Sequence, residues 1–192
     1  MKNQKRCDWV EGTFQQYIDY HDREWGVPVH DDRIHFEFII LESAQAGLSW
    51  STILKKREGY REAFAGFDPK KVAQFDESDV VRLMQNEGIV RYDKKIRSAI
   101  KNAESFLEVQ NDFGSFDSYI WEFVDHQPFI NSPGSLKEVP AKTELSDQIA
   151  KDLKKRGFSF LGSTTVYAYL QACGLVNDHT TDCFRYHDLN PE

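Results

Sequence analysis

The sequence of 192 residues lacks the features that mark membrane proteins and disulfide-rich secreted domains. No stretch approaches the roughly eighteen consecutive apolar residues that a membrane-spanning helix requires. The basic N-terminus is followed by Cys7-Asp8-Trp9 instead of an apolar run, a pattern that argues against a secretory signal. Only three cysteines are present, an odd number that leaves metal binding, catalysis or packing as their uses. We therefore expect a cytoplasmic protein that does not bind membranes.

Internal repeats, low-complexity tracts and Pro/Gly-rich linkers are also absent. A chain of this length buries about 70% of the surface that its unfolded form exposes, which is enough for one hydrophobic core. A hydrophobic content of 40% and an aromatic content of 14% fit a folded globular protein. These properties predict a single domain over residues 1–192, organised as two lobes.

The sequence has no excess of positive charge. Its formal net charge of −7 counts against nucleic-acid binding, because Lys and Arg supply most of the non-specific affinity for phosphate. Basic residues are nevertheless clustered at 55–57, 91–101 and 154–156. Each cluster on its own equally fits a solvated helix face. The charge pattern therefore neither excludes DNA as a partner nor predicts it.

Apolar residues recur at helical spacing almost throughout the chain. This periodicity predicts helices over residues 13–22, 33–46, 50–65, 78–86, 96–107, 115–125, 143–155 and 166–173. The expected N-caps are Ser78, Ser115 and Ser163, and the expected helix stops are Gly66, Gly88, Gly157 and Gly174. The irregular stretch 126–142 is expected to join two helical lobes. The predicted fold class is all-α.

Glu42 is the most informative charged residue of the predicted helix 33–46. This helix is apolar around most of its circumference, so a carboxylate at position 42 is expected to be buried. A buried carboxylate must be paired, protonated or directed into a cavity. The helix alone favours an exposed edge or an internal ion pair. The turn Gly47-Leu48-Ser49-Trp50, close to Glu42, favours a cavity that carries chemistry.

Aromatic residues are dense near the N-terminus, and five of them are Trp9, Phe14, Tyr17, Tyr20 and Trp25. Tyr17 and Tyr20 are three residues apart, so they share a helix face. Such a stripe usually belongs to a core. Aromatic faces also clamp flat heterocycles, and a tyrosine hydroxyl tolerates a wet pocket. Both interpretations remain open at this point.

Two segments are candidates for binding phosphate. Residues 79–99 read as a helix, a glycine turn at Gly88 and a second helix with basic residues near its start. Backbone N–H groups at such a turn attract anions, although an ordinary αα-hairpin has the same pattern. The segment Gly162-Ser163-Thr164-Thr165 enters a helix directly after a basic cluster and is a second, weaker candidate.

Four residues could form a metal site. His179 and Cys183 are one helical turn apart and can face one ion, and Cys7 with His21 could complete a Cys2His2 set. The wide separation of the two pairs does not match a zinc-finger pattern, so unrelated histidines and packing cysteines remain the alternative. Cys173 lies on an apolar helix face and is expected to pack in the core.

Several long segments resemble the 3-methyladenine DNA glycosylase I family of the helix-hairpin-helix superfamily. They are Cys7–Trp9, the segments 17–28, 42–50 and 153–158, and Gln171–His179, in the same order over nearly the whole chain. The resemblance implies a helix-hairpin-helix glycosylase fold with the hairpin at about 78–108. It also implies one structural zinc ion per chain that joins the terminal regions, with the ligands Cys7, His21, His179 and Cys183.

The resemblance also assigns roles in a base pocket. Glu42 would read the modified base, with its catalytic part left open. Tyr17, Tyr20 and Trp50 would line the pocket or stack on the base, and Trp25 would support it. Leu48 and Gln45 would fill the gap in the duplex, and the phosphate contacts are expected at Gly88, Arg91, Lys94, Lys95, Ser163 and Thr164.

The implied activity is hydrolysis of the N-glycosidic bond of 3-methyladenine in double-stranded DNA by a monomer that flips the base. The flipped lesion is cationic, which suits a carboxylate among aromatic rings. No lysine nucleophile is evident, so no strand-cleaving step is expected, and free 3-methyladenine is the product. One rival is a DNA-binding lesion sensor of the same fold without hydrolysis. A zinc hydrolase unrelated to DNA is disfavoured because no His-Glu-x-x-His pattern occurs.

Overall fold

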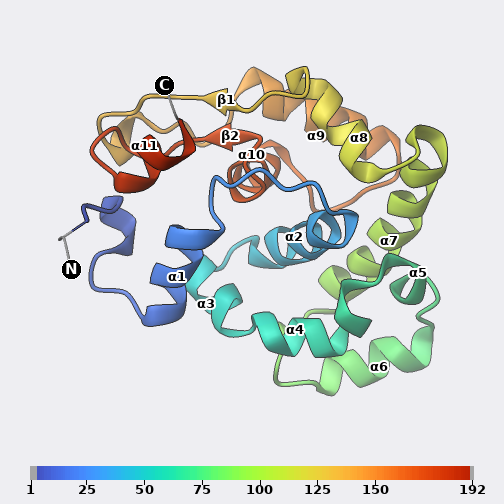
Figure 1. The fold of residues 1–192 in the computed structure, drawn as a ribbon. Coiled ribbons are helices and arrows are strands. Elements are labelled where there is room, and N and C mark those ends of the chain that lie inside the picture. The colour runs from blue at the N-terminus through green and yellow to red at the C-terminus, as the bar shows by residue number, and fades with distance from the viewer. Residues whose placement is uncertain (1–3, 191–192) are drawn as a thin grey trace.

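The computed structural model describes residues 4–190, so the outermost residues of the predicted domain, 1–3 and 191–192, lie outside the described range. The fold is almost entirely helical (Figure 1). Its α-helices are α1 (Gln15–Arg23), α2 (Asp32–Gln45), α3 (Trp50–Lys55), α4 (Arg57–Ala63), α5 (Pro69–Val72), α6 (Glu77–Gln85), α7 (Asp93–Phe113), α8 (Phe116–Trp121), α9 (Glu144–Lys155), α10 (Ser163–Ala172) and α11 (Phe184–Leu189). The short helices η1 (Asp8–Val10), η2 (Ala65–Phe67), η3 (Glu122–Val124) and η4 (Leu136–Glu138) complete the helical part. Within the described residues, no helix is long and apolar enough to cross a membrane.

Helix α2 is the centre of the fold, and α3, α4, α7, α8 and α10 all pack against it (Figure 1). Its N-cap is Asp31, whose carboxylate accepts hydrogen bonds from the backbone N–H groups of Arg33 and Ile34. Every residue from His35 to Ala44 is buried. A helix that is buried all round has no polar stripe to expose, which explains its nearly continuous apolar sequence. This burial holds α2 rigidly, and with it any side chain that it directs into a cavity.

Two short strands connect the irregular segment to the C-terminal part of the chain. β1 (Phe129–Ile130) pairs in parallel with β2 (Val176–Asn177), so that Phe129 lies opposite Val176. At the other end of the chain, the backbone N–H of Phe184 donates to the carbonyl of Lys5. The N-terminal segment therefore lies beside α11, and the two ends meet at one side of the molecule (Figure 1).

The predicted helix 50–65 is wrong as a single element, because the chain forms α3 and α4 with a break at Lys56. The backbone N–H of Lys56 bonds to the carbonyls of Ile53 and Leu54, which tightens the turn there. Apolar spacing does not detect such a local change of hydrogen-bond register. The short helices α5 and α11 were not predicted either, since four to six residues are too few to show a period.

Several predicted helix ends also differ from the structure. The N-cap of α6 is Asp76, not Ser78, because the Asp76 carboxylate accepts from two backbone N–H groups while the Ser78 hydroxyl donates to it. The N-cap of α10 is Gly162, and the Ser163 hydroxyl instead contacts that of Ser146. Helix α6 ends before Gly88, and α4 ends before Gly66. The prediction of Ser115 as an N-cap is confirmed, as are the turns at Gly157 and Gly174, both with positive φ.

Gly88 has a packing role that its position after a helix does not reveal. A Cβ atom added to Gly59 on α4 would overlap the backbone carbonyl of Gly88, so the two glycines let α4 and the α6–α7 connection touch through their backbones. This contact holds the α6–α7 connection against α4. The close approach needs a hydrogen atom in place of a side chain at Gly59.

The substitution Gly59→Ala is therefore expected to destabilise the protein. Forcing a methyl group into this contact costs about 2 kcal/mol, which lowers the melting temperature by about 4–8 °C for a chain of this size. Thermal unfolding followed by circular dichroism measures the shift. Gly134→Ala is the matched control, because its Cβ would meet only the flexible carboxylate end of Glu138. Equal melting temperatures for the two variants would contradict the role of this contact.

Candidate functional site

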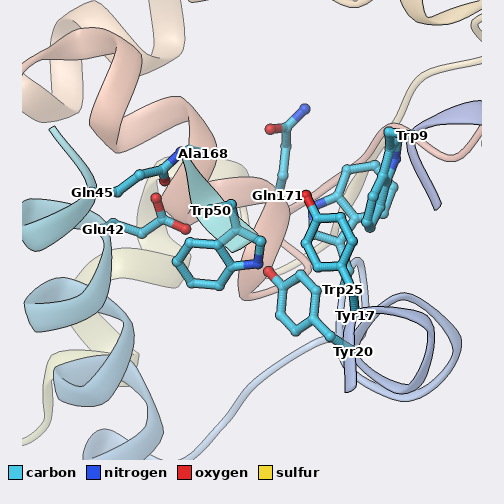
Figure 2. Close-up of a pocket in the computed structure, with 9 residues that line it drawn as sticks. All are labelled: Trp9, Tyr17, Tyr20, Trp25, Glu42, Gln45, Trp50, Ala168 and Gln171. Atoms are coloured by element: carbon cyan, nitrogen blue, oxygen red, sulfur yellow. The ribbon is translucent and has the colours of Figure 1, made fainter. Parts of the chain in front are cut away.

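A pocket opens between α1, α2, α3 and α10, with a cavity volume of about 160 Å³. Figure 2 shows the ring of Trp50 between Glu42 and Tyr20, with a group of aromatic rings on the opposite side. The residues that line the pocket are Trp9, Tyr17, Tyr20, Trp25, Glu42, Gln45, Trp50, Ala168 and Gln171. The structure thus brings together Gln45 and the five residues predicted for base binding, and α10 adds Ala168 and Gln171 from the C-terminal part of the chain.

The aromatic walls of the pocket are braced by one another. The Trp9 ring lies edge-on to Tyr17 and Trp25, with centroid distances of 5.2 and 5.1 Å. On the other wall, Tyr20 and Trp50 lie 5.3 Å apart. Rings at these distances and angles attract one another and restrict movement of their neighbours. The pocket is therefore formed in advance and suits a flat ring.

Glu42 lies in this pocket and is only 4% exposed. Burial raises the pKa of its carboxyl group to about 8, because the interior disfavours the charged form. Among the described residues, its Oε2 atom has no hydrogen-bond partner, and neither has Nε1 of Trp50 in the same pocket. Unpartnered buried polar groups are costly. Their presence together indicates a pocket built for a ligand that supplies a donor and an acceptor.

A second hollow of about 170 Å³ adjoins the pocket and shares Glu42, Gln45 and Ala168 with it. Leu48 and Thr164 also line this hollow, and the Leu48 side chain is 41% exposed. Gly47 has a φ of 78°, which turns the chain sharply between α2 and α3. Leu48 is thereby presented on a protruding turn directly beside the pocket.

The side chain of Lys95 binds the C-terminal end of α2, directly before this turn. Its Nζ atom donates to the backbone carbonyls of Ala44 and Ala46, at 2.8 and 2.6 Å. A cation at the C-terminal end of a helix interacts favourably with the free carbonyls there. Burial lowers the pKa of Lys95. This lysine therefore connects the start of α7 to the turn that carries Leu48.

The other residues predicted for phosphate contact lie in different surroundings. Arg91 and Lys94 are exposed near the start of α7. Thr164 is exposed at the start of α10, whereas the Ser163 hydroxyl contacts Ser146. On the same stretch of α7, Arg97 forms ion pairs with Glu77 and Asp93. The basic cluster 91–101 is thus partly engaged within the protein.

Cys7, His21, His179 and Cys183, the set that the family resemblance implies, form one buried cluster, and their candidate ligand atoms all lie within 4.8 Å of one another. The Sγ atom of Cys7 lies 3.5 Å from Nδ1 of His179, and Sγ of Cys183 lies 3.5 Å from Nε2 of His21. Tetrahedral zinc with ordinary Zn–S and Zn–N bonds gives S···N edges of about 3.6 Å. The geometry and the donor set therefore fit a four-coordinate metal ion.

The groups around the cluster orient its histidines. Nδ1 of His21 lies 2.8 Å from a carboxylate oxygen of Asp22, and Nε2 of His179 lies 3.0 Å from the carbonyl oxygen of Trp25. Such partners select the tautomer that leaves the other nitrogen free for a metal. Contacts from Cys7 and from the two histidines lower the pKa of Cys183, which favours the thiolate that metals bind, while the hydrogen bond with Cys183 raises the pKa of Cys7.

The cluster of cysteines and histidines also lies directly behind the tryptophans of the pocket wall. The Trp25 ring lies 4.6 Å from the His179 ring, and the Trp9 ring lies 5.1 Å from the His21 ring. The sequence shows Trp9 as one of several aromatic residues without assigning it to the pocket, and it does not place Gln171 or Ala168 of α10 there. Gln171 lies about 130 residues from Glu42 in the chain, so no local pattern links the two.

An aromatic pocket with a buried carboxyl group, carried by a helical fold, defines a protein that binds a flat, polar ring. The sequence matches the methyladenine glycosylase family over residues 9–186, and the chain belongs to this family. The family resemblance noted in the sequence is thereby confirmed.

Two relatives match nearly the full chain. It is 51% identical over 178 residues to a DNA-3-methyladenine glycosylase of Haemophilus influenzae, covering 93% of this chain and 96% of the relative. It is 49% identical over 187 residues to DNA-3-methyladenine glycosylase 1 of Escherichia coli, covering 97% and 100%.

Solved structures agree with these matches. A crystal structure of 3-methyladenine DNA glycosylase I has a TM-score of 0.91 and 53% identity, covering 94% of this chain and 98% of the other. A variant of 3-methyladenine DNA glycosylase I in complex with 3-methyladenine also has a TM-score of 0.91, with 37% identity and coverage of 97% and 98%.

Proposed function

We propose that this protein is a DNA glycosylase that hydrolyses the N-glycosidic bond of 3-methyladenine in alkylated DNA. The observation that carries the proposal is the buried Glu42, whose unpartnered Oε2 lies in an aromatic pocket beside the unpartnered Nε1 of Trp50. Methylation at N3 makes adenine cationic while it is attached to deoxyribose. A carboxylate among aromatic rings stabilises such a cation, and neutral adenine gains less from the same pocket.

The base must leave the duplex to enter this pocket. Flipping costs a few kcal/mol, and the exposed Leu48 on the turn beside the pocket can offset part of that cost by occupying the gap. Gln45 lines both hollows and would assist at the same place. The glycosidic bond then breaks through an oxocarbenium-like sugar, and the base departs neutral with the electron pair of that bond. Water adds to C1′ of the sugar and releases a proton to solvent. Little acid catalysis is needed, which agrees with a site that centres on one carboxyl group.

Helices α6 and α7 with their connection are, in this proposal, the hairpin of a helix-hairpin-helix fold, within a single domain of two lobes that acts as a monomer. The connection at Gly88 and the exposed Arg91 and Lys94 would contact phosphate on one side, and Thr164 on the other. Lys95 and Ser163, predicted as phosphate contacts, have internal partners in the structure. Their part in DNA binding would therefore be to hold the turn and the start of α10 in place.

The cluster of Cys7, His21, His179 and Cys183 would hold one zinc ion. Zinc with four protein ligands supplies structural stability and leaves no position for an activated water. The four side chains connect the N-terminal segment to the region before α11, and their histidines support the tryptophans of the pocket wall. A role for the cluster in bond cleavage is not part of the proposal.

The direct test is to incubate the purified protein with methylated duplex DNA and to identify the released bases by chromatography. Release of free 3-methyladenine, with abasic sites that break only after alkali treatment, is the expected result. Tight binding of the methylated duplex without base release would instead identify a lesion sensor. Strand breaks before alkali treatment would contradict the absence of a lyase step.

The variant Leu48→Ala is expected to excise 3-methyladenine from duplex DNA about tenfold more slowly, because the gap left by the flipped base is then poorly filled. Its affinity for the free base should be unchanged, because Leu48 lies outside the base pocket. Single-turnover excision and a fluorescence titration measure the two effects. Ile130→Ala is the control, as a similarly exposed apolar side chain on β1. If Leu48→Ala also bound the free base about tenfold more weakly, the role of Leu48 in filling the gap would be contradicted.

A further inference from the structure

Gln171 is a pocket residue whose side-chain amide is held in one orientation. It lies on α10, and its Nε2 atom donates to Oδ2 of Asp178 at 2.7 Å. In the view of Figure 2, the amide oxygen of Gln171 is turned toward the side of Glu42 and the nitrogen is turned away. An amide can in principle be reversed, so the question is what prevents the reversal.

Asp178 prevents it because its buried carboxylate accepts hydrogen bonds from three side chains, Gln171 among them. It is 1% exposed. The Tyr167 hydroxyl donates to Oδ2 at 2.6 Å, and Nδ2 of Asn131 donates to Oδ1 at 2.7 Å. Tyr167 and Gln171 are four residues apart and therefore on one face of α10. All three side chains donate to this carboxylate, so the amide of Gln171 presents its nitrogen to Asp178.

The fixed amide leaves a hydrogen-bond acceptor for the pocket. Reversing it would place two oxygen atoms against each other in a buried setting, where an unmade hydrogen bond is costly. A ligand that shares the pocket with Gln171 therefore meets a carbonyl oxygen and not an amino group. This distinguishes purines, since position 6 carries a donating amino group in adenine and an accepting oxygen in guanine.

We propose that Gln171, oriented by Asp178, is a specificity-determining residue that favours 3-methyladenine over 3-methylguanine. Gln171 accepts a hydrogen bond from the 6-amino group of the flipped base and repels a 6-oxo group. Asp178 is a positioning residue that does not touch the base. The inference rests on the proposed function, because it assumes that a flipped methylated purine occupies the pocket, and it adds the feature of the purine that is read.

The test measures release of both bases from the same methylated duplex, which contains both lesions, under single-turnover conditions. Wild-type protein is expected to release 3-methyladenine faster than 3-methylguanine. In Gln171→Met, which keeps the length of the side chain but has no acceptor, the ratio of the two rates should fall about tenfold. In Asp178→Asn the ratio should fall as well, since an asparagine can donate to a reversed Gln171 amide.

The ratio separates this role from a structural one, because partial unfolding lowers both rates in proportion. Tyr167→Phe is the matched control: it removes one donor from the same carboxylate, away from the pocket lining, and should leave the ratio unchanged. An unchanged ratio in Gln171→Met, or an equal fall in Tyr167→Phe, would overturn the inference while wild-type release of 3-methyladenine upholds the proposed function. Release of neither base by the wild type would overturn the proposed function itself.

Discussion

Replacement of Glu42 by glutamine is expected to reduce release of 3-methyladenine on the order of a hundredfold or more, in line with the loss of one preorganised electrostatic contact. Glutamine keeps the size of the side chain but removes the negative charge that favours a cationic base. Single-turnover kinetics on methylated duplex DNA measure the change. Glu37→Gln is the control, because Glu37 is also buried on α2 but pairs with Arg57 and Arg61. That variant should lose stability and keep the wild-type pH profile.

The protonation of Glu42 also predicts how the excision rate depends on pH. With a pKa of about 8, Glu42 is mostly protonated at neutral pH in the free protein. Because the carboxylate is the form that attracts the cation, the rate of the wild type at low DNA concentration should rise with pH and level off above about pH 8. The rate of Glu42→Gln should lack this rise. A Glu42→Gln protein with wild-type activity, or with the same pH profile, would contradict the role assigned to Glu42.

The raised pKa of Glu42 also affects the stability of the folded state. The folded state holds the Glu42 proton more tightly than the unfolded state, so this group lowers stability as pH rises from about 4.5 through 8. Glu42→Gln should therefore be more stable than the wild type at pH 8. Gain of stability with loss of activity is typical of a residue that is retained for function.

Removal of the metal should give the second large effect. The purified protein is expected to contain about one zinc ion per chain. When the free-ion concentration is about a thousandfold above the dissociation constant, binding adds about 4 kcal/mol to the free energy of unfolding. Removing the ion should therefore lower the melting temperature by about 10 °C. Metal analysis and calorimetry with and without a chelator measure both quantities. The substitution Cys183→Ser should have the same effect as the chelator.

Cys173→Ala is the matched control for the metal site. Cys173 is buried and free like the cluster cysteines but lies on the α10 side of the core, outside the cluster. The control should keep its zinc, and its melting temperature should still fall when the chelator is added. A wild-type protein without zinc after gentle purification, and with no response to the chelator, would contradict a metal in this cluster.

The parts of the site that follow local rules were predictable from the sequence. Glu42 was recognisable as unusual because a carboxylate within an apolar helix conflicts with burial, and the structure places it in a pocket. The one-turn spacing of His179 and Cys183 was readable in the same way. Joining this pair to Cys7 and His21 required either the family resemblance or the fold, since nothing local connects the two ends.

Other features depend on contacts that a sequence pattern does not contain. The sequence pattern predicts a phosphate-binding turn at Gly88, and only the structure shows that Gly59 packs against its backbone. The sequence places Lys95 in a basic cluster, whereas in the structure its ammonium group binds the end of α2. Gln171 lies in a segment that carries the family resemblance, but no sequence pattern assigns its side chain to the pocket. The structure shows the contact with Asp178, which the following turn brings back to α10.

The internal pairing of cations at the start of α7 bears on how such a protein would travel along DNA. Lys95 donates to carbonyl groups, Arg97 pairs with two carboxylates, and Arg91 pairs with Glu87, so most cations of this segment already have partners within the protein. Each neutralised phosphate releases counterions and adds to the salt dependence of binding. With few such contacts and a net charge of −7, encounters with undamaged DNA would be brief and weakly dependent on ionic strength. Residence at a lesion would then depend on the capture of the flipped base.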